Sequence, residues 1–82
     1  MRITIGIWEL PVGTAGIVAG YHRVYGGYMG KLISKGLLPN TSFVILNFAL
    51  ERTVQIMLQD RIITLSKPEA NALCIDLKEE DL

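Results

Sequence analysis

The sequence has little of the chemistry on which enzymes and metal sites depend. It contains one cysteine, Cys74, and one histidine, His22, in 82 residues. A structural zinc site needs about four ligands at close spacing, and a thiol nucleophile needs an imidazole base beside it. A single cysteine also excludes an internal disulfide, which fits a reducing compartment. We therefore predict a cytoplasmic protein that is not an enzyme and has no metal site and no cofactor, weak adventitious divalent cations aside.

Long hydrophobic runs and a strong net charge are absent as well. The longest uncharged stretch, residues 36–50, is shorter than the roughly 18 residues of a membrane span and contains Pro39. The apolar stretch near the N-terminus is interrupted by Glu9 and Pro11, which favours a strand over a signal peptide. Eight basic residues balance eight acidic ones. We expect no membrane insertion and no nucleic-acid partner.

The acidic residues are unevenly placed. Four of the eight lie in the last seven positions of the chain, beside the single Lys78. This pattern predicts one domain over residues 1–77, followed by an acidic, frayed tail over residues 78–82. A domain of this size is marginally stable alone, and association into a homo-oligomer is a common remedy.

Short apolar stretches bounded by turn residues predict a mainly β protein. We expect strands over residues 3–7, 14–21, 42–48, 53–58, 62–65 and 73–77. Gly16 and Gly20 interrupt the second of these, and glycine inside a strand indicates a bulge or a sharp bend. About five or six short strands with strong curvature are typical of a small barrel or sandwich, closed to protect its edges.

Two helical segments are expected between the strands. Residues 25–36 are amphipathic, with Tyr25, Tyr28, Met29, Leu32 and Ile33 on one arc of the helical wheel. Several glycines shorten this helix to about residues 28–35. Ser66 and Glu69 have the spacing of a capping box, which predicts a helical turn over about residues 67–72.

The turn positions carry residues that suit unusual backbone conformations. Gly13 closes a Leu-Pro-Val-Gly turn, and Gly36 follows the main helix, where a left-handed residue commonly ends a helix. Pro39 and Asn40 suit the two central positions of a type II turn, the second of which needs a positive φ. Asp60 lies in a further turn between two strands.

Aromatic and basic side chains gather near the main helix. Tyr21, Arg23, Tyr25, Lys31 and Lys35 are our candidate partner-binding residues, because tyrosine and arginine are enriched at protein interfaces. In an alternative interpretation the tyrosines pack the helix on the barrel while the cations face solvent. An oligonucleotide surface is a third interpretation, for which there are few cations.

The order of these pieces resembles the ferrous-iron transport protein A (FeoA) family. The matching residues are Leu10-Pro11-Val12-Gly13 with Gly16 and Val18, Lys31-Leu32, Gly36 to Thr41, Ile63-Thr64-Leu65, Glu69-Ala70 and Leu73 to Ile75. The resemblance spans about residues 8–77. Asn40 and Asp60 stand where the family usually has glycine. Since both residue types tolerate positive φ, we expect both to be left-handed.

The resemblance implies an SH3-like barrel that serves as a cytosolic accessory of ferrous-iron uptake. Its partner would be the cytosolic part of a FeoB-type, GTP-dependent membrane transporter, and the family offers no catalytic residues to transfer. A similar domain occurs at the C-terminus of diphtheria-toxin-repressor-like metalloregulators. The alternative is therefore a freestanding metal-responsive regulator, which would bind metal near His22, Glu9 or the acidic tail.

Overall fold

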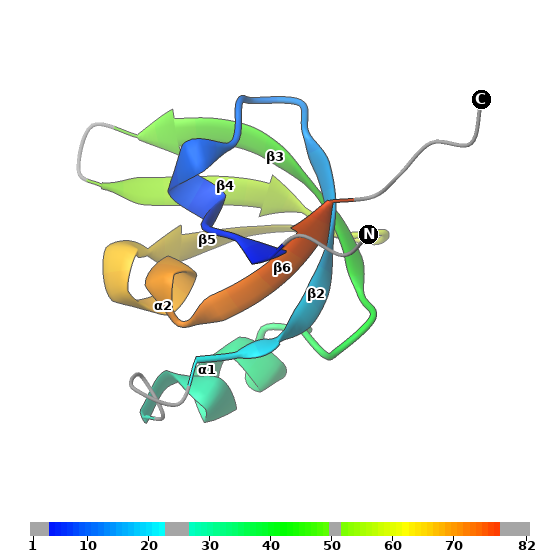
Figure 1. Ribbon diagram of the computed structural model, residues 1–82. Coiled ribbons are helices and arrows are strands. Elements are labelled where there is room, and N and C mark those ends of the chain that lie inside the picture. Colours follow the sequence, from blue (N-terminus) through cyan, green and yellow to red (C-terminus); the bar gives the residue numbers. More distant parts are fainter. Residues whose placement is uncertain (1–3, 23–26, 50–51, 78–82) are drawn as a thin grey trace.

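The computed structural model describes residues 4–22, 27–49 and 52–77. Its strands are β1 (Thr4–Ile5), β2 (Ala15–Tyr21), β3 (Ser42–Ala49), β4 (Thr53–Met57), β5 (Ile62–Ser66) and β6 (Leu73–Leu77). Its helices are the 3-10 turn η1 (Ile7–Glu9), α1 (Met29–Ser34) and α2 (Lys67–Asn71). All neighbouring strands pair antiparallel in one sheet, in the order β1-β6-β2-β3-β4-β5 (Figure 1).

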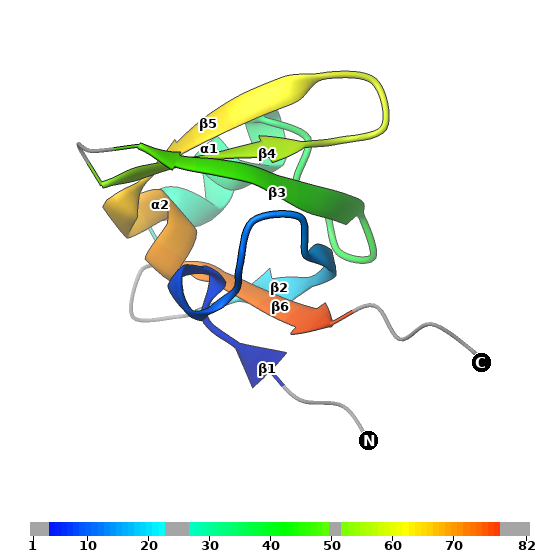
Figure 2. The ribbon, with the colours of Figure 1, turned by 90° about the horizontal axis from the view of Figure 1, so that it is seen from above.

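The sheet bends back on itself into a small barrel. Figure 2 shows β3, β4 and β5 in one layer and β2, β6 and β1 in the other. Strand β2 connects the layers, because it pairs with β3 through Ala15, Gly16 and Ile17 and with β6 along most of its length. Its register with β6 shifts between Val18 and Gly20, and such an irregularity increases local bending. The prediction of a mainly β, SH3-like barrel is confirmed.

The core follows from the alternation of apolar residues along the strands. In β4, Val54 and Ile56 are buried, whereas Gln55 and Met57 between and after them are exposed. The inward residues of both layers form one cluster with residues from the loops and helices, namely Ile7, Leu10, Val18, Leu32, Leu37, Phe43, Ile45, Val54, Ile56, Leu58, Leu65, Ala70, Ala72, Leu73 and Ile75.

Gly16 of β2 leaves room for the ring of Phe43, its paired residue on the adjacent strand β3. A Cβ atom at Gly16 would lie 2.7 Å from Cζ of Phe43, well inside the normal contact distance. Gly20, at the register shift, has no neighbour within 4 Å of such an atom. Both glycines were expected to mark curvature, and the structure separates their roles. Gly16 makes room for an aromatic ring, and Gly20 lies where the strand bends.

The turn predictions are confirmed except for one backbone angle. Gly13, Gly36 and Asn40 have φ values of 90°, 97° and 73°. The turn at Asn40 is closed by the N–H of Thr41, which donates to the Leu38 carbonyl. The expected positive φ at Asp60 is wrong.

Within the described residues, the other non-glycine residue with positive φ is Arg52, at 61°. Asp60 does lie in the β4–β5 turn, which the N–H of Leu58 closes by donating to the carbonyl of Arg61 at 2.7 Å. This turn therefore forms without a left-handed residue at Asp60. The β3–β4 hairpin instead requires that conformation at Arg52.

The N-terminal strand and the main helix are shorter than expected. The strand predicted over residues 3–7 ends at Ile5, and Ile7 is buried within η1. Helix α1 begins at Met29, and it buries only Leu32 of its apolar arc. Tyr25 and the tail over residues 78–82 lie outside the described residues. No helix in the described part of the chain is long and apolar enough to cross a membrane.

Candidate functional site

Tyr21, the first of the predicted partner-binding residues, connects two parts of the fold. It ends β2, and its hydroxyl donates a hydrogen bond to the Leu37 carbonyl, just after α1. Burial raises the pKa of this hydroxyl, so it stays protonated and able to donate. Its ring packs against the core. The packing role proposed for the tyrosines thus holds for Tyr21.

Lys35 is engaged within the protein. Its Nζ lies 2.9 Å from Oε2 of Glu69 and donates to the carbonyl of Thr64 at 2.9 Å. Glu69 in turn accepts the N–H of Ser66 at 2.9 Å, so the predicted capping box is present. Because β5 is the last strand of the sheet, these contacts cover part of its free edge.

The carboxyl group of Glu69 is stabilised in its charged form. Burial alone would raise its pKa. Hydrogen bonds from the Ser66 backbone, Lys35 and the Ser66 hydroxyl, together with the charge of Lys35, outweigh burial and lower the pKa below its ordinary value. The Lys35–Glu69 pair is therefore a structural ion pair that ties α1 to α2.

The exposed face of helix α1 includes aliphatic residues that were not among the predicted partner-binding residues. Met29 and Ile33, one helical turn apart, are 44% and 41% exposed although they belong to the apolar arc. Lys31 is exposed, and its Nζ lies 5.4 Å from the centroid of the Tyr28 ring. Arg23 and Tyr25 lie outside the described residues. The assignment of the cluster to partner binding stays a prediction, and α1 contributes to it two aliphatic side chains and one cation.

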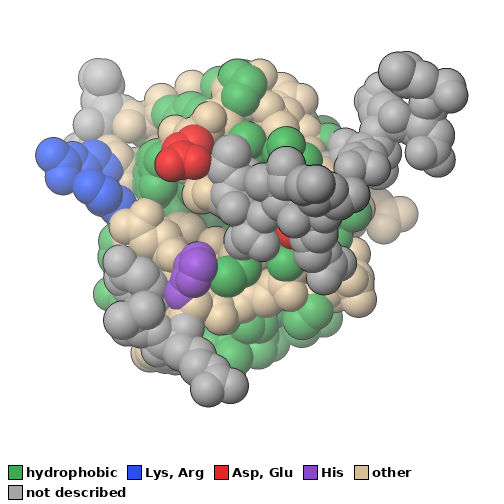
Figure 3. Space-filling model, in the orientation of Figure 1, with side chains coloured by type: hydrophobic (Ala, Val, Ile, Leu, Met, Phe, Trp, Pro, Cys, Tyr) green, Lys and Arg blue, Asp and Glu red, His purple; other side chains and the backbone are tan. Residues whose placement is uncertain are grey.

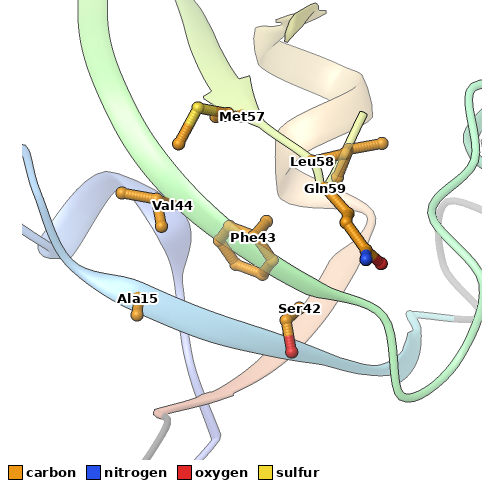
Figure 4. A pocket seen from close by; sticks show the side chains of 7 residues that line it. All are labelled: Ala15, Ser42, Phe43, Val44, Met57, Leu58 and Gln59. Atoms are coloured by element: carbon orange, nitrogen blue, oxygen red, sulfur yellow. The ribbon is translucent and has the colours of Figure 1, made fainter. Parts of the chain in front are cut away.

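A shallow groove of about 290 Å³ opens where β2, β3 and β4 meet (Figure 4). Its lining residues are Ala15, Ser42, Phe43, Val44, Met57, Leu58 and Gln59. All of these are uncharged, and the polar groups among their side chains are one hydroxyl and one amide. Such a lining can accept an apolar side chain but offers no acid, base or nucleophile.

The groove continues along the outer face of the sheet as a row of apolar residues that are paired across neighbouring strands. Val44 is the Cα partner of both Ala15 and Met57, and Met57 is the partner of Ile62. Met57 and Ile62 are 42% and 59% exposed. We call Ala15, Val44, Met57 and Ile62 the outer row. Sequence reasoning missed it, because alternation indicates which residues point outward but not which of them become neighbours.

Catalytic and metal-binding groups do not converge in the described part of the chain. No cluster of three or more histidine, cysteine, aspartate or glutamate side chains there could hold a metal ion. Burial, together with the charge of Asp76, raises the pKa of the Cys74 thiol, which keeps it in the less nucleophilic form. His22 is exposed, and its backbone N–H donates to Ala72 at 2.8 Å.

Comparison with known proteins finds a matching family model and solved structures with the same fold. The family model described as FeoA domain matches residues 7–77. No curated protein is significantly similar to the chain in sequence. A FeoA-like protein from Clostridium acetobutylicum has a TM-score of 0.84 at 20% identity, over 100% of this chain and 95% of that one. A structure described as an iron uptake regulatory protein (FeoA) has a TM-score of 0.75 at 20% identity, over 90% of this chain and 96% of that one.

The same fold occurs as part of larger regulators. A manganese-dependent transcriptional repressor in complex with manganese has a TM-score of 0.84 at 15% identity, over 95% of this chain. The chain covers 38% of that repressor's length. At such identities, these structures share the fold with the chain.

Proposed function

This chain belongs to the FeoA domain family, and from that premise we propose that it is a non-catalytic accessory of ferrous-iron uptake. In this proposal it acts in the cytoplasm without a cofactor. It binds the cytosolic part of a FeoB-type iron transporter through protein–protein contacts. The observation that supports a particular surface is the exposed face of α1.

The apolar arc of helix α1 has more residues than the core buries. Leu32 is fully buried, while Met29 and Ile33 on the same arc remain exposed. Exposed aliphatic side chains that lie together and carry a charged rim are typical of interaction sites. Lys31 supplies that charge at the same helix. Lys35 contributes less, because its ammonium group is paired with Glu69.

Two exposed isoleucines provide a matched experiment. Ile33 on α1 and Ile62 on the outer row are 41% and 59% exposed, so the same change to aspartate can be made on each surface and the two variants compared. We expect Ile33→Asp to weaken binding to the purified cytosolic domain of the transporter, measured by calorimetry, and to reduce ferrous-iron uptake in cells. We expect Ile62→Asp to leave both unchanged.

The outcomes of this experiment distinguish a wrongly assigned docking surface from a wrongly proposed function. Loss of binding in Ile62→Asp alone would move the docking surface to the outer row and leave the accessory role intact. Normal uptake and binding in both variants would contradict the assignment of either surface. No binding of the native chain to the transporter's cytosolic domain would overturn the proposed function itself. Circular-dichroism spectra of both variants control for folding.

The shared fold with metal-dependent repressors supports one alternative, a freestanding metal-responsive regulator. This alternative requires the chain to bind a divalent metal stoichiometrically. Calorimetric titration of the native protein with Mn²⁺ and, without oxygen, with Fe²⁺ tests it directly. A flat titration would remove the alternative without affecting the accessory role.

A further inference from the structure

Trp8, Arg52 and Lys67 line a pocket of about 430 Å³, and none of them belongs to α1 or lines the groove. These residues come from η1, from the position just before β4 and from the first position of α2. Figure 3 shows blue side chains gathered at one edge of the molecule, where the β3–β4 hairpin ends. The pocket thus combines an aromatic ring with two cations.

Arg52 and Lys67 line the same pocket, and no acidic residue that the structure describes forms an ion pair with either of them. Thr53 of β4 is paired with Ser66 of β5, so Arg52 before it and Lys67 after its partner occupy the same end of this ladder. Both side chains are exposed, and neither forms an ion pair with a residue that the structure describes. Like charges that line one pocket repel each other. An anion bound between them would remove that repulsion.

Trp8 is held in position beside the cations. Its Nε1–H donates to Oδ1 of Asn71 at 2.9 Å. Its ring packs against Phe48, with the ring centroids 5.6 Å apart and the planes at 39°. The indole is only partly buried, so the remainder of a fixed apolar ring is available at the pocket. A rigid aromatic group of this kind loses little conformational entropy when it binds.

We propose that this pocket binds an acidic protein segment, in which carboxylates pair with Arg52 and Lys67 and an adjacent apolar side chain packs on Trp8. Charge complementarity supports this partner, since the residues of the lining that the structure describes carry two positive charges and no negative one. Tryptophan and arginine are also the residue types most enriched at the energetic centres of protein interfaces. A small inorganic anion would contact the cations but leave the indole unused.

The single tryptophan makes the proposal directly measurable. Trp8 is the only one in the chain, so the intrinsic tryptophan fluorescence of the protein reports on this pocket alone. As a probe we choose a synthetic peptide with the sequence of residues 76–82, which has four acidic residues and two leucines. We expect a saturable blue shift of the emission, because the indole loses contact with water, and weaker binding as salt screens the charges.

Matched peptides and variants decide the outcome. Arg52→Ala and Lys67→Ala should each weaken peptide binding roughly two- to fivefold, as expected for exposed ion pairs. Lys31→Ala, which removes an exposed cation on α1, should have no effect. The same peptide with its acids replaced by the corresponding amides should not bind. A blue shift with the amide peptide, unchanged affinity in both pocket variants, or saturation by inorganic phosphate alone would overturn the proposal.

Discussion

Alanine at Gly16 would place a methyl group 2.7 Å from Cζ of Phe43 and about 3.1 Å or more from its neighbouring ring carbons. The ring cannot move aside freely, because Phe43 is 2% exposed and lies within the core. Either the ring leaves its preferred rotamer or β2 and β3 separate at the Gly16–Phe43 pair. Both responses disturb the junction between the two layers of the barrel.

Two opposing contributions set the size of the effect. Overpacking of a core typically costs about 1–3 kcal/mol. Replacement of glycine by alanine also reduces the conformational entropy of the unfolded chain, which stabilises the native state by about 0.4–1 kcal/mol. We therefore expect Gly16→Ala to lower the free energy of unfolding by about 1–2 kcal/mol. In a domain of this size, each kcal/mol corresponds to a decrease in Tm of about 4–8 °C.

Gly20 of the same strand provides the control. An added Cβ there meets no atom within 4 Å, and its φ is not in the left-handed region. Gly20→Ala should therefore be neutral or should stabilise the protein by about 0.4–1 kcal/mol. Urea titrations followed by far-ultraviolet circular dichroism would measure both variants under the same conditions.

A second substitution tests the cause of the destabilisation. If the Phe43 ring is the obstacle, Phe43→Leu should cost less in the Gly16→Ala background than in the native protein, because the smaller side chain leaves room for the methyl group. Equal stability of Gly16→Ala and Gly20→Ala, or strictly additive effects of Gly16→Ala and Phe43→Leu, would refute the reasoning.

Two further predictions concern Glu69 and Asn40. Because the pKa of Glu69 is lowered in the folded state, its stabilising contribution is complete above its ordinary pKa and is lost as the pH falls through the lowered value. When the pH is lowered from about 6 to about 3, the free energy of unfolding of Glu69→Gln should therefore decrease less than that of the native protein. Equal decreases in the two proteins, measured by urea titration, would contradict this. With a φ of 73° at position 40, Asn40→Ala should cost about 1 kcal/mol in a thermal unfolding experiment. Asn40→Gly should be close to neutral, and equal losses in the two variants would show that φ is not the cause.

Local features of the fold could be predicted because each depends on residues close together in the chain. The capping box at Ser66 and Glu69 and the left-handed residues at Gly36 and Asn40 follow from side-chain chemistry within a few positions. Asp60 shows the limit of this reasoning. Its residue type permits a positive φ but does not require one, and the β4–β5 turn closes without it.

The candidate surfaces could be predicted only in part. Lys35 and Tyr21 were expected at the partner-binding surface together with Lys31, and their sequence positions give no sign that Glu69 and Leu37 engage them. These contacts join residues from different elements, so they depend on how α1 packs against the end of the sheet. The reduced burial of α1, with Met29 and Ile33 exposed, has the same origin.

By itself, the sequence determined that the protein is a small, mainly β domain, with little of the chemistry that catalysis needs. Periodicity, turn residues and the scarcity of cysteine and histidine are properties of the chain alone. Only the tertiary structure decided which of those residues share a surface. The outer row depends on strand register, and the pocket of Trp8, Arg52 and Lys67 depends on three elements that meet in space. The fold can therefore be predicted from local sequence patterns, whereas the candidate binding surfaces depend on packing between elements that are distant in the chain.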